Sequence, residues 1–188
     1  MAKVFLVYGT RGAGKTTATL TVADGLAHRG IAVGGYFQQS TTDDLERRGY
    51  DLVRVGDRTQ TVPLARPGGT EQAGTSAVCT FSFSQESFAA GLGWLQQDAP
   101  ACRVLVLDEI SKLEVRGEGH AQALRWALGL GEETLLLLSV RGDQLFYVME
   151  AFALEAHVAG YLELPAEPSQ LREQIDQLAC GLLVPARP

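Results

Sequence analysis

The chain has 188 residues, of which 46% are hydrophobic and 20% charged, proportions that are typical of a globular protein and not of a disordered one. This length suits one domain of ordinary size, so we expect residues 1–188 to form a single domain. The formal net charge of −6 opposes tight binding to a nucleic-acid backbone, and no apolar run approaches the roughly 18 residues that a membrane span needs, so neither partner is expected.

The first predicted unit is a strand, a glycine-rich loop and a helix. Residues 3–8 form an apolar run of strand length, which the glycines of residues 9–14 interrupt. A helix follows from Lys15 to about His28, and residues 31–37 read as the next strand. This alternation predicts a parallel sheet with helices on its faces. The first strand begins without the basic and long apolar segments of a signal peptide, so a cytoplasmic location is expected.

The middle of the chain departs from this alternation. Residues 50–55 and 59–64 have a period near two and predict a β-hairpin. Residues 66–76 are rich in glycine and proline, which predicts a loop that serves as a candidate lid over bound substrate. A short strand is expected at residues 77–83 and a helix at residues 84–97.

The second half returns to alternating strands and helices. Residues 103–107 are an unbroken apolar run, typical of a strand buried on both faces, and two carboxylates follow it. The remaining elements are expected as helices near 118–129, 143–152 and 169–179 and as strands at 134–140 and near 156–162. The whole pattern predicts an α/β fold, with a mostly parallel sheet, helices on both faces and an added β-hairpin.

The glycine-rich loop carries a phosphate-binding motif. The segment Gly9-Thr10-Arg11-Gly12-Ala13-Gly14-Lys15-Thr16 fits G-x-x-x-x-G-K-[ST] between a predicted strand and helix. Its glycines let successive N–H groups converge on a phosphate, and the helix adds its positive end. Lys15 is expected to neutralise the β- and γ-phosphates, Thr16 to ligate Mg²⁺ and Thr17 to touch the α-phosphate. Arg11 either reaches a phosphate as a cis arginine finger or projects into solvent.

An acidic pair follows the strand at residues 103–107. The aspartate of this pair, Asp108, stands where a Walker B element places the residue that holds Mg²⁺. In open parallel sheets ligands collect beyond the carboxyl ends of strands, so the pair should face the glycine-rich loop. The adjacent Glu109 is then placed to orient and polarise the water that attacks the γ-phosphorus, which favours hydrolysis over transfer.

Three segments together resemble one family. In the order Gly9–Thr16, Arg48–Val53 (RGYDLV) and Asp108–Glu114 (DEISKLE), the chain is similar to the small cancer-related nucleoside-triphosphatases over most of its length. The resemblance implies a three-layer, RecA-like P-loop NTPase fold. It also implies slow, Mg²⁺-dependent hydrolysis of ATP, GTP and other nucleoside triphosphates.

The same resemblance assigns residues beyond the acidic pair. Lys112 and Glu114 match the K-x-E of the family and should lie near the active site, with Lys112 either contacting phosphate or pairing with a surface acid. Ser111 replaces the usual glycine. Residues 165–170 stand where the family tends to carry an Asn-Arg pair, so base contacts from that region are not assigned.

Several alternatives stay open at this point. One is a P-loop transferase, either a kinase or a corrinoid adenosyltransferase, since the latter also has a glycine loop and a hydrophobic strand ending in Asp-Glu. Another is a nucleotide-dependent switch, which would bind without turnover. An arginine finger could come from Arg11, from Arg141 after the strand at 134–140, or from another subunit. Base preference and oligomeric state are not readable, and the three histidines have no partner at a ligand or triad spacing.

Overall fold

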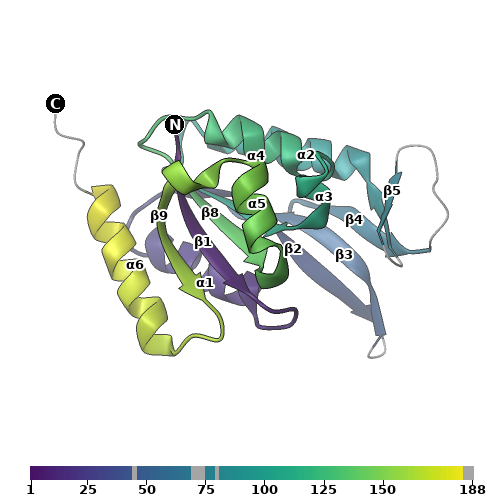
Figure 1. Cartoon of the computed structure of the whole chain (residues 1–188), viewed down its shortest axis with the longest axis horizontal. Coiled ribbons are helices and arrows are strands. Elements are labelled where there is room, and N and C mark those ends of the chain that lie inside the picture. Colours follow the sequence, from purple (N-terminus) through teal and green to yellow (C-terminus); the bar gives the residue numbers. More distant parts are fainter. Residues whose placement is uncertain (44–45, 69–74, 79–80, 184–188) are drawn as a thin grey trace.

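The computed structural model describes residues 1–43, 46–68, 75–78 and 81–183. In that part of the chain nine strands form one sheet, in the order β5-β6-β4-β3-β2-β7-β8-β1-β9 (Figure 1). The strands are β1 (Lys3–Gly9), β2 (Val33–Asp43), β3 (Glu46–Arg54), β4 (Thr61–Pro67), β5 (Thr75–Val78), β6 (Phe81–Ser84), β7 (Val104–Ile110), β8 (Leu135–Arg141) and β9 (Val158–Glu163).

The helices connect and cover these strands. They are α1 (Lys15–Ala27), α2 (Gln85–Asp98), α3 (Lys112–Val115), α4 (Ala121–Leu128), α5 (Leu145–Ala151) and α6 (Pro168–Leu183), with short 3-10 turns η1 (Gly142–Gln144) and η2 (Leu154–Ala156). Among the described residues, no helix combines the length and the apolar character that crossing a membrane would require.

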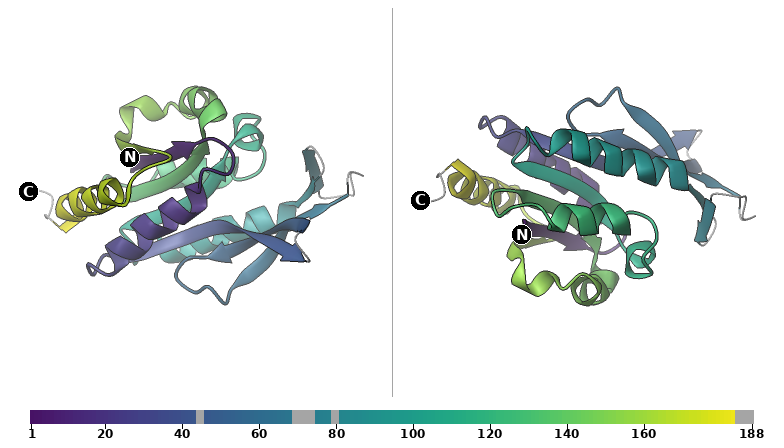
Figure 2. Two further views of the ribbon diagram at one scale, coloured as in Figure 1. Left: turned by 90° about the horizontal axis from the view of Figure 1, so that it is seen from below. Right: turned by 90° about the horizontal axis from the view of Figure 1, so that it is seen from above.

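The parallel half of the sheet separates two hydrophobic cores. Strands β2, β7, β8, β1 and β9 run parallel to one another. Along β7, Leu105 and Leu107 point into one core, and Val104 and Val106 into the other, as the period of two in a strand requires. Helices α2, α3, α4 and α5 cover the first face, and α1 and α6 cover the second (Figure 2). The three-layer α/β fold expected from the sequence is confirmed.

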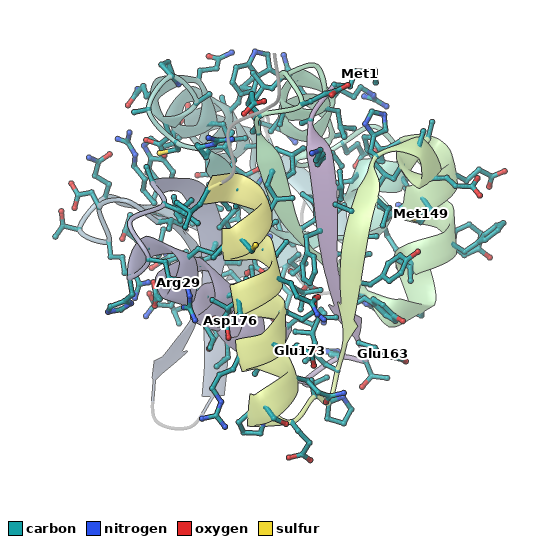
Figure 3. The ribbon with its side chains drawn as sticks, turned by 90° about the vertical axis from the view of Figure 1, so that its left-hand side faces the viewer. Met1, Arg29, Met149, Glu163, Glu173 and Asp176 are labelled. Carbon is teal, nitrogen blue, oxygen red and sulfur yellow. The ribbon has the colours of Figure 1, made fainter. Side chains whose placement is uncertain are left out.

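On the second face of the sheet, helices α1 and α6 are in close contact. Gly25 of α1 leaves no room for a side chain, because a Cβ there would lie 2.7 Å from Cδ1 of Ile175 on α6. Beyond the end of α1, Arg29 forms an ion pair with Asp176 of α6 (Figure 3). These contacts hold α6 against the helix that follows the glycine-rich loop.

The antiparallel half of the sheet is larger than the sequence predicted. The hairpin of residues 50–55 and 59–64 is confirmed as β3 and β4, but β2 also pairs antiparallel with β3 as far as Asp43. The single strand predicted at 77–83 is wrong, because β5 and β6 form a second hairpin there. Helix α2 packs against β3 and β4, and β5 forms the edge of the sheet farthest from α6 (Figure 1).

The predicted loop at residues 66–76 and one helix boundary also need correction. Residues 66 and 67 belong to β4 and residues 75 and 76 to β5, while residues 69–74, the centre of the candidate lid, lie outside the described residues. The helix predicted near 118–129 starts at Ala121, because Gly117 and Gly119 adopt positive φ angles of 82° and 59° between α3 and α4.

Candidate functional site

The glycine-rich loop joins β1 to α1 and depends on its glycines for two different reasons. Gly12 and Gly14 have φ angles of 81° and 83°, in the left-handed region that side chains disfavour. Gly9 has no space for a side chain, because a Cβ would lie 3.0 Å from the Cβ of Leu164. Lys15 opens the helix and folds back over the loop, where its Nζ donates to the carbonyl oxygen of Thr10 at 3.3 Å.

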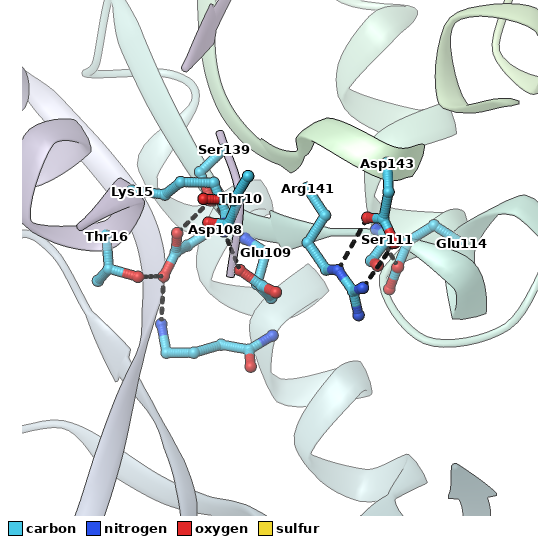
Figure 4. Close-up of polar contacts among 11 residues, drawn as sticks. Thr10, Lys15, Thr16, Asp108, Glu109, Ser111, Glu114, Ser139, Arg141 and Asp143 are labelled. Atoms are coloured by element: carbon cyan, nitrogen blue, oxygen red, sulfur yellow. Dashed lines mark hydrogen bonds and ion pairs between the residues drawn. The ribbon is translucent and has the colours of Figure 1, made fainter. Parts of the chain in front are cut away.

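Asp108 lies at the centre of the site and is fully buried. Its Oδ2 accepts a hydrogen bond from the Thr16 hydroxyl at 2.8 Å and another from the backbone N–H of Gln38 at 3.0 Å. Its Oδ1 accepts one from the Ser139 hydroxyl (Figure 4). Strand β8 lies between β1 and β7, so the carboxyl ends of all three strands meet beside the loop. The structure thus brings together Thr16 and Asp108, which the sequence placed 92 positions apart.

Glu109 has an unusual backbone conformation beside this aspartate. Its φ of 60° is rare for a residue with a side chain, and the register between β7 and β8 shifts between Leu107 and Ile110 around it. The Glu109 N–H donates to Ser139 Oγ at 2.7 Å, which fixes the irregular turn. Its carboxylate lies 3.7 Å from the Nζ of Lys15 and is partly exposed. The site therefore holds one buried acid and one that reaches the surface.

The two acids have raised pKa values for the same main reason. Burial raises the pKa of Asp108, against the hydrogen bonds from Ser139, Gln38 and Thr16 that lower it. Burial also raises the pKa of Glu109; the charge of Lys15 lowers it, while that of Asp108 raises it.

The turn after β7 is held by a third acid, Glu114. One of its carboxylate oxygens accepts from the N–H of Ser111 at 2.8 Å, and the other accepts from the N–H of His120 at 2.9 Å. Burial raises the pKa of Glu114 to about 7. The resemblance placed this residue near the active site, and it lies on the segment that follows the acidic pair (Figure 4).

For a histidine without a ligand or triad spacing the sequence predicts a position at the surface or at a helix end, and His120 has only the second. It precedes α4, as a helix-end residue should, but it is 1% exposed. Its ring lies 4.7 Å from the ring of Tyr36, between centroids, and 4.7 Å from that of Phe88. Burial lowers its pKa to about 3, so it is neutral near pH 7.

The cationic residues named from the sequence have distinct environments. Arg11 is exposed on the loop, and its side chain forms no hydrogen bond or ion pair with any residue that the structure describes. Arg141 ends β8 and pairs with Asp143 at 2.7 Å. Lys112 is exposed at the start of α3, and its charge helps lower the pKa of Asp143, less strongly than Arg141 does.

Two residues that touch Asp108 were missed by reasoning from sequence. Ser139 carried a detectable signal, because it is the one polar residue within the aliphatic run of residues 135–140. Gln38 acts through its backbone N–H, which any residue other than proline supplies, so its side chain carried no such signal.

Fold and site together define the class of this protein. A strand, a G-x-x-x-x-G-K-[ST] loop and a helix stand beside a strand that ends in Asp-Glu, on a largely parallel sheet with helices on both faces. This arrangement is that of P-loop proteins, which bind nucleoside triphosphates. A family model described as NTPase matches residues 4–154, and the chain belongs to that NTPase family. It is a nucleoside-triphosphatase.

Individual relatives agree with this assignment. The chain is 30% identical to the human cancer-related nucleoside-triphosphatase over 135 residues, which cover 68% of this chain and 70% of the human one. It is 27% identical to nucleoside-triphosphatase THEP1 of Thermofilum pendens, over 94% of this chain and 97% of that protein. The solution structure of a human cancer-related nucleoside triphosphatase superposes with a TM-score of 0.73 at 21% identity, covering 100% of both chains, which supports the fold.

Proposed function

We propose that the chain hydrolyses ATP, GTP and other nucleoside triphosphates with Mg²⁺ held between Thr16 and Asp108 and with Glu109 as the base for the attacking water. The observation that carries this proposal is the contact between Thr16 Oγ1 and Asp108 Oδ2 at 2.8 Å, with Glu109 as the next residue. This contact joins the end of the loop to the acid pair, so that one small region offers groups for phosphate, metal and water.

Residues Gly9 to Thr17 would bind the phosphates. The left-handed conformations of Gly12 and Gly14 support a loop whose N–H groups turn toward a common anion. Lys15 is 6% exposed and lies between the loop and Glu109, where its ammonium group would meet the β- and γ-phosphate oxygens. Thr17, one position further along α1, would contact the α-phosphate. These contacts use groups common to all nucleotides, which supports a broad base preference.

The residues present fit Mg²⁺. A hydroxyl and a carboxylate oxygen, already 2.8 Å apart, are the hard donors that this ion prefers. Among the described residues, no cluster of three or more His, Cys, Asp or Glu side chains could hold a metal. Mg²⁺ rarely needs such a cage, because water and substrate phosphates complete its shell. When bound, it would neutralise negative charge on the β- and γ-phosphate oxygens.

Glu109 is the residue that distinguishes hydrolysis from simple binding. Its backbone is fixed by Ser139, while its carboxylate is partly exposed beside Lys15. A carboxylate in this position accepts a hydrogen bond from water, orients it toward the γ-phosphorus and takes its proton as the new bond to phosphorus forms. The leaving nucleoside diphosphate keeps the bridging oxygen. Membership of the NTPase family favours this reaction over transfer to a second substrate.

A turnover screen tests the proposal. Phosphate release is measured with ATP, GTP, CTP and UTP, each with Mg²⁺ and with a chelator. We expect Mg²⁺-dependent release from all four. Unchanged release in the chelator would rule out the role of the ion, and acceleration by a nucleoside, nucleotide or corrinoid acceptor would favour a transferase.

A single substitution tests the base. Glu109→Gln should lower kcat by about 100-fold or more, because general-base catalysis contributes about 10²- to 10⁴-fold. Its affinity for nucleoside diphosphate should stay within about threefold of the parent, since phosphate binding relies on the loop. Glu133→Gln, at an exposed ion pair with Arg103, is the matched control and should hydrolyse like the parent. Equal kcat values for Glu109→Gln and the control would refute the assignment.

A further inference from the structure

The position of Arg141 relative to the glycine-rich loop suggests a further role for this residue. It is the last residue of β8, and its Cα partner on β1 is Gly9, the first residue of the loop. The next residue, Gly142, packs so closely that a Cβ there would lie 3.4 Å from the backbone of Gly9. The backbone of Arg141 is therefore fixed at the edge of the site.

The side chain of Arg141 is directed between two acids. Figure 4 shows its guanidinium group on the side of Glu109 that faces Asp143. Two of its nitrogens donate to Asp143, Nε to Oδ1 at 3.1 Å and Nη2 to Oδ2 at 2.7 Å. Its charge also acts on Glu109, whose pKa it lowers, although burial, the largest effect, raises that pKa. The guanidinium thus lies within electrostatic range of the proposed base.

We propose that Arg141 is a catalytic residue that binds the γ-phosphate in cis, and that Asp143 holds its guanidinium group until a triphosphate binds. This inference rests on the proposed function of the site. It names the source of the arginine finger, a choice that the sequence alone leaves open among Arg11, Arg141 and another subunit.

The energetics favour release of Arg141 to a triphosphate. The side chains of Arg141 and Asp143 are 30% and 56% exposed. Exposed ion pairs of this kind change an equilibrium constant by less than about fivefold. A terminal phosphate carries more charge than a carboxylate, and it accepts the two parallel bonds of a guanidinium group. After Arg141 has moved to the phosphate, Asp143 keeps a favourable electrostatic interaction with Lys112.

Arg11 is less suited to this role. It is exposed on the loop, and its side chain has no hydrogen-bonding or ionic partner within the described residues. Its freedom must therefore be lost on binding, whereas Arg141 projects from a strand residue that pairs with Gly9 and whose neighbour Gly142 packs against the backbone of Gly9.

Binding and turnover of Arg141→Ala test the proposal together. Titration calorimetry measures the affinity for ADP and for a nonhydrolysable ATP analogue, and phosphate release measures kcat. We expect ADP affinity within about twofold of the parent, analogue affinity about tenfold weaker and kcat at least 100-fold lower. The matched control is Arg103→Ala. Arg103 forms a similar exposed pair with Glu133 just before β7 and β8 begin, at the opposite end of these strands from the site, so this control should match the parent in all three.

The holding role of Asp143 is tested by Asp143→Asn. This change should tighten binding of the ATP analogue by up to about fivefold and leave ADP binding unchanged. Weaker or equal analogue binding would refute the role of Asp143. Equal loss of ADP and analogue affinity in Arg141→Ala, or a kcat within fivefold of the parent, would refute the role of Arg141. Failure of the parent itself to hydrolyse ATP would instead refute the proposed function, and the comparison of ADP with the analogue would still decide whether Arg141 binds the γ-phosphate.

Discussion

Replacing Ser139 with alanine should reduce both stability and turnover. Ser139 is fully buried, and its hydroxyl donates to Asp108 and accepts from the N–H of Glu109 at 2.7 Å. Removal leaves the N–H of Glu109 without its acceptor, a loss of about 1–3 kcal/mol, and takes one donor from Asp108, a loss of about 1.5–3 kcal/mol. Asp108 keeps its bonds from Thr16 and Gln38, so we expect a total near the sum of the two lower limits, about 2.5 kcal/mol.

Turnover should fall as well, because the hydroxyl fixes the backbone from which Glu109 projects. The φ of 60° at Glu109 is a strained conformation that costs about 1–3 kcal/mol and persists only where its surroundings hold it. Without Ser139 the backbone of Glu109 is no longer held, so its carboxylate is less well positioned and kcat should fall by more than about tenfold. Ser139→Thr keeps the hydroxyl and should recover most of the activity.

Urea unfolding and steady-state phosphate release are the two measurements. Ser87→Ala is a matched control, because Ser87 is also a buried serine and its hydroxyl donates to the carbonyl oxygen of Pro63 at 2.7 Å, away from the site. This control should lose about 1 kcal/mol of unfolding free energy and no activity. The reasoning is wrong if Ser139→Ala and Ser87→Ala lose equal stability, or if Ser139→Ala turns over as fast as the parent.

Two further predictions concern stability. The pKa of Glu114 is about 7 in the folded protein and 4.5 in the unfolded chain. Its protonation therefore stabilises the fold fully below pH 4.5, and this contribution of about 3 kcal/mol to the unfolding free energy is lost as the pH rises to about 7. Unfolding free energies at pH 5 and pH 8 should therefore change less in Glu114→Gln than in the parent, and an equal change in both would contradict this. Gly35→Ala should lose about 3 kcal/mol or more, because φ is 94° and a Cβ would lie 2.2 Å from the carbonyl oxygen of Val106. Gly93→Ala, in open space on α2, should instead gain up to about 1 kcal/mol, and similar thermal midpoints for the two variants would refute the steric argument.

The parallel half of the fold was predictable because its signals are local. The strand at β7 is an apolar run buried on both faces, and the glycines at positions 12 and 14 mark a backbone conformation that other residues disfavour. The antiparallel half was harder, because short edge strands have weak periodicity and depend on their partners. Residues 77–83 therefore predicted one strand, although β5 and β6 form a hairpin.

The sequence by itself determined the loop and the acid pair, since each is a short contiguous motif whose chemistry depends on residue type and spacing. Only the tertiary structure decided how they meet. The placement of β8 between β1 and β7 brings Ser139 against Asp108, Gly9 beside Arg141, and Thr16 within 2.8 Å of Asp108. These contacts join strands far apart in the chain, and strand order is set by the packing of helices on both faces of the sheet, which no single segment encodes.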